Sequence, residues 1–266
     1  MIKNILTIAG TDPSGGAGIQ ADIKTFSALG TYAMSVITAV VAQNTQGVRS
    51  FQIMDPKMVA DQIDAIFQDI HVDAVKIGML GNELIVRIVA QKLREYNVAK
   101  VVIDPVMVAK SGDHLINDAA INALKDELFP LATLITPNIP EACVLLNRDD
   151  PITMLEMKEE AQKLLSFGSH WVLLKGGHLE GFNCFDVLCN KNEIFDYEDE
   201  RVLTNNNHGT GCTLSSAITA LIPVMEIPDA VREAKTYLGH ALKAGNQLQV
   251  GKGHGPVNHF YRIWNL

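Results

Sequence analysis

Short apolar runs alternate with amphipathic stretches along most of this chain. The runs are rich in β-branched residues and predict buried strands at residues 5–9, 36–42, 74–77, 101–103, 134–136 and 172–174. Between them, apolar residues recur at helical spacing and predict helices at 19–29, 55–67, 83–96, 118–128 and 153–167. Continuously apolar strands separated by helices are typical of a mostly parallel sheet covered by helices on both faces.

A hairpin is predicted near the end of this alternation. Residues 185–189 and 193–197 flank Asn190-Lys191-Asn192, a turn-forming sequence, and so predict an antiparallel edge to the sheet. No repeat, low-complexity tract or linker interrupts the pattern. We therefore predict an α/β fold with three α/β/α layers, formed as a single domain over residues 1–266.

Composition and charge narrow the possible functions. The chain has 266 residues, of which 47% are hydrophobic and 20% charged, as in ordinary soluble proteins. The net charge of −8, with no run of lysine or arginine, argues against a nucleic-acid partner. The amino-terminal stretch is too short for a signal peptide, and no apolar run approaches the roughly 18 residues of a membrane span.

Cysteine usage favours the cytoplasm. Cys143, Cys184, Cys189 and Cys212 form neither a C-x-x-C pair nor a zinc-binding spacing with histidines. The first three are interpreted as small apolar core residues. A reducing cytoplasm is therefore the expected location.

The chemically unusual residues follow the predicted strands. In an open α/β sheet, ligands bind outside the carboxyl ends of the strands. These ends carry the segment 10–18, Gln43-Asn44, Gly78-Met79, Asp104-Pro105-Val106, Pro137-Asn138 and Lys175-Gly176-Gly177. Their convergence predicts a ligand site at this edge of the sheet.

A glycine-rich segment at 207–216 carries the strongest chemical signal. Gly209 and Gly211 precede Cys212, and apolar positions at helical spacing then continue to Pro223. A glycine-rich loop that opens a helix presents free N–H groups and a positive dipole end to an anion. We expect this environment to lower the pKa of the Cys212 thiol, which would favour a base or a nucleophile. A small residue chosen for close packing is the less favoured alternative.

The segment 10–18 and Asp22 each leave two interpretations open. The segment lacks the P-loop signature and a clean G-x-G-x-x-G, so it is either a flexible turn or a cover over the substrate. Asp22 lies on the apolar stripe of its predicted helix and needs a partner there. An anchor for a small ligand is favoured over an internal bond.

Five other polar residues give weaker signals. The Gln43 amide can both donate to and accept from a nitrogen heterocycle. Asn138 and Glu141 either position a hydrated Mg²⁺ or cap a helix. Lys175 contacts phosphate or is a solvated charge. His208 caps the glycine loop or approaches phosphate, and the capping role is favoured.

Several of these segments together resemble a known family. They are residues 9–22, 42–47, 76–80, 104–107, 136–141 and 208–216. In this order they are similar to the hydroxymethylpyrimidine/phosphomethylpyrimidine kinases of thiamine biosynthesis, within the ribokinase superfamily. The resemblance implies a ribokinase-like fold, Mg²⁺ and a homodimer. It also implies ATP-dependent phosphorylation of 4-amino-5-hydroxymethyl-2-methylpyrimidine to its monophosphate and then to its diphosphate.

The resemblance assigns roles to individual residues. Asp22 and Gln43 would hold the pyrimidine. The pocket wall would comprise Gly10, Val41, Met79 and Val106. The nucleotide would contact Asn138, Lys175 and Thr210. The metal would lie near Glu141, through water, and near Asp104. The catalytic group would comprise Gly209 and Gly211, forming an anion hole, together with Cys212.

Three alternatives to this kinase activity remain open. The wider superfamily usually has aspartate where Cys212 stands, and some pyridoxine-phosphorylating relatives share the cysteine, so a pyridoxine or pyridoxal kinase is the main alternative. A thiol hydrolase or acyltransferase would need a third partner beside Cys212 and His208. A non-catalytic pyrimidine sensor is disfavoured because every expected site position is filled. Residues 10–18 and 109–114 are candidates for a closing loop, and no fused thiaminase-like domain is expected.

Overall fold

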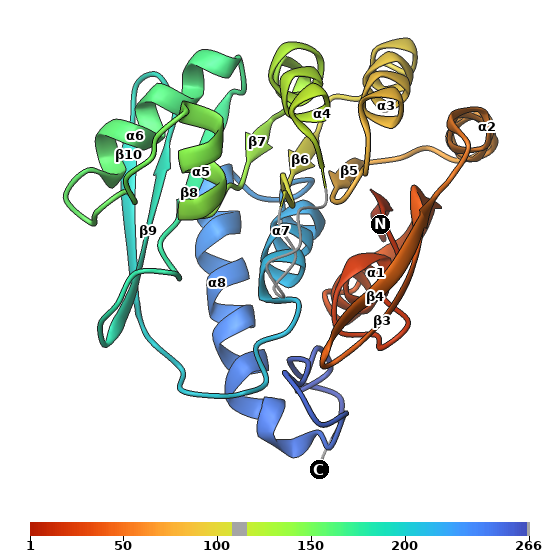
Figure 1. Cartoon of the computed structure of the whole chain (residues 1–266). Helices are drawn as coiled ribbons and strands as arrows, with labels where there is room; N and C mark the ends of the chain where they lie inside the picture. The colour runs from red at the N-terminus through yellow and green to blue at the C-terminus, as the bar shows by residue number, and fades with distance from the viewer. Residues whose placement is uncertain (108–115, 265–266) are drawn as a thin grey trace.

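The computed structural model describes residues 1–107 and 116–264 of the chain (Figure 1). The strands are β1 (Asn4–Ala9), β2 (Tyr32–Ile37), β3 (Ala39–Asn44), β4 (Gly47–Ile53), β5 (Ala74–Ile77), β6 (Val101–Ile103), β7 (Leu134–Ile135), β8 (Trp171–Lys175), β9 (Asn183–Cys189) and β10 (Ile194–Glu200). The α-helices are α1 (Gly18–Ala28), α2 (Pro56–Phe67), α3 (Glu83–Glu95), α4 (Asp118–Ala123), α5 (Ile139–Leu146), α6 (Met157–Leu164), α7 (Thr210–Leu221) and α8 (Ile227–Lys243). The predicted segment 109–114 lies outside the described residues.

The main sheet has the predicted mixed topology. Its described strands follow the order β10-β9-β8-β7-β6-β5-β1-β2. Neighbours from β2 to β8 pair in parallel, whereas β9 pairs antiparallel with both β8 and β10. The prediction of a parallel sheet with an antiparallel edge hairpin is confirmed.

Two hydrophobic cores lie on opposite faces of this sheet. On β1, Leu6 and Ile8 pack into one core, which also contains buried residues of α2, α3, α4, α5 and α6. The preceding residue, Ile5, packs into the other core, with residues of α1, α7 and α8. Because successive side chains of a strand point to opposite faces, one apolar run supplies both cores. The three-layer arrangement is thereby confirmed (Figure 1).

The predicted strand at 36–42 is divided between two sheets. It breaks at the fully buried Thr38, whose N–H donates to the Ala9 carbonyl and whose hydroxyl donates to the Met79 carbonyl at 2.6 Å. β2 ends in the main sheet, and β3 continues with β4 as a separate antiparallel pair. The pair stands apart from the main sheet (Figure 1). Apolar periodicity does not reveal the break, because both halves are equally apolar.

Other boundaries differ from the predictions by a turn or more. The helix predicted at 118–128 is α-helical to Ala123 and then widens into a π-helical turn. The helix predicted at 153–167 begins at Met157. The helix α8 and the strand β4 were not predicted, and α5 was foreseen only as the helix that Asn138 and Glu141 could cap. Among the described residues, no helix is both long enough and apolar enough to cross a bilayer.

Candidate active site

The glycine loop opens α7 in the geometry of an anion site. Gly209 caps the helix in the left-handed region, at φ +77°. The helical hydrogen bonds begin where Thr213 N–H donates to the Gly209 carbonyl at 2.8 Å. The N–H groups of Thr210, Gly211 and Cys212 come before that bond, so they have no acceptor within the helix. They and the helix dipole can together hold an anion.

The glycine loop faces the carboxyl ends of two strands. A Cβ added at Gly211 would lie 3.4 Å from Asp104 Oδ2, just after β6, and 3.5 Å from Lys175 Nζ, at the end of β8. Three residues distant in sequence therefore meet at one point. A Cβ at position 211 would therefore be in van der Waals contact with both side chains.

Lys175 lies among buried carboxylates. Its Nζ donates to Asp104 Oδ1 at 2.8 Å, and the side chain is only 12% exposed. Burial opposes the charged ammonium, but Asp104 and Glu141 outweigh it and raise the pKa of Lys175. Burial likewise opposes the charged form of Asp104, yet Lys175 and Lys76 lower its pKa. Lys175 is thus held as a cation beside the glycine loop, and the solvated-charge alternative for it is wrong.

Asn138 and Glu141 form the helix cap that was one of their two interpretations. The Asn138 side chain accepts from Glu141 N–H at 2.9 Å, and Glu141 Oε2 accepts from Asn138 N–H at 2.9 Å. This capping box opens α5. Burial and then Asp104 raise the pKa of Glu141, against the opposing Lys175. The capping role does not exclude contacts with nucleotide or metal, so those roles stay predictions.

The donor set fits magnesium rather than a softer metal. Asp104 and Glu141 offer hard carboxylate oxygens close to the anion site. No group of three or more His, Cys, Asp and Glu side chains in the described parts of the chain could enclose an ion. Mg²⁺ commonly binds through one or two carboxylates, several waters and substrate phosphates, so these residues suit it.

The environment of Cys212 is the reverse of the one predicted. Burial raises the pKa of its thiol to about 11, and Lys76 and the backbone of Gly18 only partly offset that rise. The prediction of a lowered pKa is wrong, because loss of solvent outweighs the neighbouring cation. Without ligands, Cys212 is a neutral thiol at pH 7.

Asp22 forms an internal network. Both of its oxygens lie 3.0 Å from Lys76 Nζ, and both side chains are fully buried. The hydroxyls of Thr7 and Ser216 donate to the same carboxylate at 2.6 and 2.7 Å. The internal bond, which was the less favoured interpretation, is therefore present. A direct bond from Asp22 to a pyrimidine stays a prediction that would require this network to rearrange.

Lys76 is a site residue that reasoning from the residues missed. It interrupts the apolar run of β5 and is fully buried beneath the carboxyl ends of the strands. Burial opposes its charge, but Asp22, Cys212 and Asp104 raise its pKa. The signal was available, since a lysine in a buried strand and an aspartate on an inward helix stripe require each other.

The predicted pocket wall residues come from four segments, namely β3 and the loops after β1, β5 and β6. A Cβ at Gly10 would lie 3.3 Å from Met79 Sδ. Val41 is buried, and its N–H donates to the Thr11 hydroxyl at 3.0 Å. Val106 has φ +34°, a strained conformation for a β-branched residue and one that often marks a functional site. The wall that they form is a prediction consistent with these positions.

Gln43 and His208 meet at a residue that was not predicted, Asp12. His208 Nε2 lies 2.8 Å from Asp12 Oδ2, and the Gln43 side chain also hydrogen-bonds to Asp12. His208 therefore joins the glycine loop to the loop after β1, which agrees with its favoured capping role. Asp12 gave no sequence signal because aspartate is common in turns.

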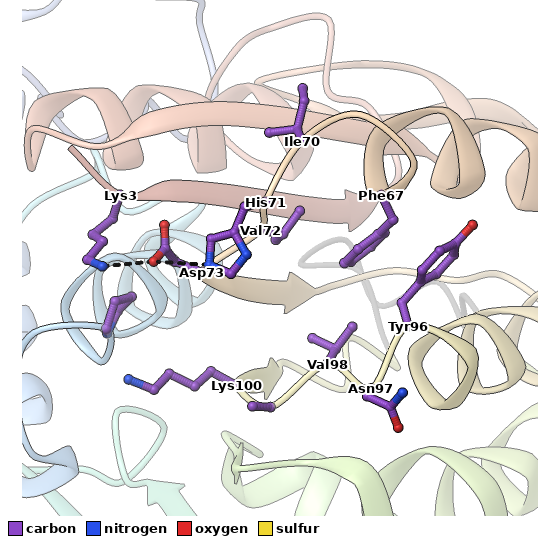
Figure 2. Close-up of a pocket in the computed structure, with 12 residues that line it drawn as sticks. Lys3, Phe67, Ile70, His71, Val72, Asp73, Tyr96, Asn97, Val98 and Lys100 are labelled. Atoms are coloured by element: carbon purple, nitrogen blue, oxygen red, sulfur yellow. Dashed lines mark hydrogen bonds and ion pairs between the residues drawn. The ribbon is translucent and has the colours of Figure 1, made fainter. Parts of the chain in front are cut away.

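A concave region lies at the opposite end of the sheet from these residues. It has a volume of about 470 Å³ and contains the ion pair between Lys3 and Asp73 (Figure 2). Phe67 and Tyr96, which stack with centroids 4.7 Å apart, form its apolar wall. None of the predicted site residues lines it, so the chemistry belongs to the carboxyl ends.

Comparison with known proteins agrees with the geometry. A family model described as phosphomethylpyrimidine kinase matches residues 12–258. The chain belongs to this phosphomethylpyrimidine kinase family. It is 50% identical over 262 residues to the hydroxymethylpyrimidine/phosphomethylpyrimidine kinase of Escherichia coli strain K12, and the matched residues cover 98% of each of the two chains.

Solved structures show the same fold for two activities. A phosphomethylpyrimidine kinase from Clostridium difficile 630 is 45% identical to this kinase, with a TM-score of 0.80, and covers 90% of this chain and 99% of its own. A Staphylococcus aureus pyridoxal kinase bound to AMP-PCP and pyridoxal is 31% identical, with a TM-score of 0.90, and covers 100% of this chain and 96% of its own. The ribokinase-like fold is confirmed, and it alone does not select the substrate.

Proposed function

We propose that this kinase transfers a phosphoryl group from ATP to the hydroxymethyl oxygen of 4-amino-5-hydroxymethyl-2-methylpyrimidine, and then a second one to the monophosphate formed. In each step a bond forms between the acceptor oxygen and the γ-phosphorus of ATP. The bond from that phosphorus to the β–γ bridging oxygen breaks, and ADP leaves. The observation that carries the proposal is that the glycine loop, Lys175 and Asp104 meet at one point. The chain that forms this point is 50% identical to a hydroxymethylpyrimidine/phosphomethylpyrimidine kinase over 262 residues.

The residues of the site supply positioning and charge. Phosphoryl transfer passes through a loose transition state in most analyses, so catalysis is mostly orientation and electrostatic stabilisation. The N–H groups of Thr210, Gly211 and Cys212 would hold the transferring oxygens. Lys175 would offset phosphate charge on the nucleotide side. Mg²⁺, near Asp104 and Glu141, would neutralise charge on the β- and γ-phosphates.

The substrate side is proposed from the loop and the hairpin. Gln43, Gly10, Val41, Met79 and Val106 would surround the pyrimidine. Asp22 would act from behind this wall by holding Lys76. Such an arrangement would place the acceptor oxygen toward Cys212.

The assay that tests this function counts phosphates. This kinase is incubated with ATP and the pyrimidine alcohol, and products are resolved by mass. We expect up to two phosphates per molecule, and chelation of Mg²⁺ should stop turnover. An end point of one phosphate would remove the second step, and ATP consumption without any pyrimidine phosphate would contradict the proposal.

Pyridoxal phosphorylation is the second candidate. It is favoured by the likeness to pyridoxal kinases of the same fold. The ratio of kcat/KM for the pyrimidine alcohol to that for pyridoxal decides between the two. We expect the ratio to exceed 1, and a value well below 1 would reverse the assignment.

We also infer a cytoplasmic homodimer, with residues 1–266 as a single domain. The proposed contact surface is the β3–β4 pair, which stands apart from the main sheet, and Val40 and Phe51, 52% and 43% exposed, lie one on each of its faces. Sedimentation that gives only the 29.0 kDa monomer would contradict the dimer.

Lys175→Met should weaken both phosphoryl transfers. Loss of one charged contact to phosphate is expected to reduce kcat/KM roughly 10- to 100-fold in each step. Steady-state assays of the two steps measure it, with Lys191→Met as the matched control, since Lys191 is exposed in the β9–β10 turn. An unchanged kcat/KM for Lys175→Met would exclude the phosphate contact.

A further inference from the structure

A single buried carboxylate organises the loop that follows β1. Asp12 is fully buried, and its Oδ1 accepts from the backbone N–H and the hydroxyl of Ser14, at 2.8 and 2.7 Å. Its Oδ2 accepts from Gly16 N–H at 3.1 Å and from Ala17 N–H at 2.7 Å. These bonds fix the loop, and Ala17 directly precedes α1.

The same carboxylate reaches two other segments. His208 Nε2 lies 2.8 Å from Oδ2, and because a carboxylate only accepts, this nitrogen must donate. Gln43 from β3 bonds to Asp12 as well. Burial opposes the charge of Asp12, but bonds from His208, Ser14 and Gln43 outweigh it and lower the pKa of the carboxyl. One charge thus joins the loop after β1, the β3–β4 pair and the glycine loop.

Backbone contacts interlock the two loops that Asp12 and His208 connect. A Cβ at Gly209 would lie only 1.7 Å from the Gly16 carbonyl oxygen. A Cβ at Gly16 would lie 2.4 Å from the His208 ring. Each loop therefore needs the other's glycine, and neither can shift alone while the Asp12–His208 bond is in place.

His208 is itself anchored from the far side. Its N–H donates to the Gly255 carbonyl at 3.0 Å, and it pairs with Pro256 in a parallel bridge. The carboxyl-terminal segment therefore anchors the His208 backbone, while Nε2 of the ring contacts Asp12. Because Gly209 follows His208 directly, a displaced imidazole would carry the helix cap of α7 with it.

We propose that Asp12 and His208 are positioning residues that hold the anion hole of α7 in register with the loop over the acceptor. The proposal rests on the phosphoryl transfer proposed above. Neither residue needs to touch the reacting atoms, because the pair fixes the distance between the glycine loop and the loop after β1. A misplacement of about 1 Å at a reacting centre can cost about 100-fold in rate.

The test compares His208→Ala with His208→Gln in the full chain. His208→Ala should lower kcat for the first transfer roughly 10- to 100-fold, with KM for ATP and for the pyrimidine alcohol changed less than about threefold. The glutamine amide can donate from near the position of Nε2, so His208→Gln should recover most of kcat. A structural role would instead lower the melting temperature and every kinetic parameter together.

A second measurement does not depend on catalysis. Hydrogen–deuterium exchange should show lost protection of the Gly16 and Ala17 amides in His208→Ala and in Asp12→Asn, and retained protection in His208→Gln. This readout separates failure of the positioning role from failure of the proposed function. Intact protection in His208→Ala would overturn the positioning role even if wild-type activity is present.

Asp73→Asn is the matched control. Asp73 also accepts hydrogen bonds, from Lys3 Nζ at 2.8 Å and from the backbone N–H of Asn4 at 2.9 Å. It lies at the opposite end of the sheet, where Figure 2 shows its contact with Lys3. It should leave kcat and the exchange of Gly16 and Ala17 unchanged. A loss of kcat in Asp73→Asn as large as in His208→Ala would assign the effect to general destabilisation and overturn the proposal.

Discussion

Cys212→Ala is expected to slow the first phosphoryl transfer far more than the second. The first acceptor is an alcohol, whose proton must leave as the bond to phosphorus forms. The second acceptor is a phosphate monoester, already largely ionised at pH 7 because its second pKa is about 6. A general base contributes roughly 10²- to 10⁴-fold, so a loss of that size is expected in the first step only.

The pH dependence of kcat/KM for the first step should also report a base role of Cys212. A base acts when deprotonated, and burial raises the pKa of Cys212 to about 11. At pH 7 the thiolate is therefore roughly one part in 10⁴, and kcat/KM should rise about tenfold per pH unit between pH 7 and 9. The second step should lack this rise, and Cys212→Ala should abolish it in the first.

Two variants separate proton acceptance from packing. Cys212→Ser keeps the size of the side chain but has a far less acidic hydroxyl, so it should behave like Cys212→Ala. Cys143→Ala removes a thiol that bonds only loosely to the Asp150 carbonyl, at 3.7 Å, and should leave both steps intact. Equal losses in the two steps, or full activity of Cys212→Ser, would leave Cys212 a packing residue.

Lys76→Met is expected to destabilise the whole molecule. It removes the cation from a fully buried pair and leaves Asp22 charged in the core between β1 and α7. Breaking a buried pair from one side costs about 3–5 kcal/mol. For a chain of this size that corresponds to a fall of roughly 10 °C in melting temperature. Calorimetric unfolding at one fixed pH measures it.

The paired substitution shows whether the isolated charge is the cause. Lys76→Met combined with Asp22→Asn removes both charges and keeps an oxygen for the Ser216 hydroxyl, so it should recover more than half of the loss. Lys57→Met breaks the exposed pair with Asp61 and should change the melting temperature little. A fall for Lys76→Met no larger than for Lys57→Met would refute the structural role of the buried pair.

Lys76 also links stability to chemistry. Its ammonium lowers the pKa of Cys212, although burial prevails. In Lys76→Met the pH at which the first step accelerates should therefore move upward. Asp22 holds that ammonium in place, which gives it an indirect role in the reaction beside its predicted contact with the pyrimidine.

Much of the fold was predictable because its signals are local. The apolar runs that became β1, β5, β6 and β8 each supply both cores, so their composition alone indicates a covered parallel sheet. The β9–β10 hairpin was marked by its turn residues. The division at Thr38 was not predictable. It depends on hydrogen bonds to Ala9 and Met79, and both residues are distant from Thr38 in the sequence.

The candidate site also has features that the sequence predicts and features that it does not. Sequence by itself determined which residues follow the carboxyl ends of the strands, because apolar runs and the glycines after them are local features, whereas the order of the strands in the sheet is not. Only the tertiary structure decided their electrostatics. It paired Asp22 with Lys76 and joined Asp12 to His208. It also buried Cys212, and burial raises the pKa of the thiol, which the position at a helix start was expected to lower. The physical reason is that solvation and charge depend on all neighbours within a few ångströms, and those neighbours come from across the chain.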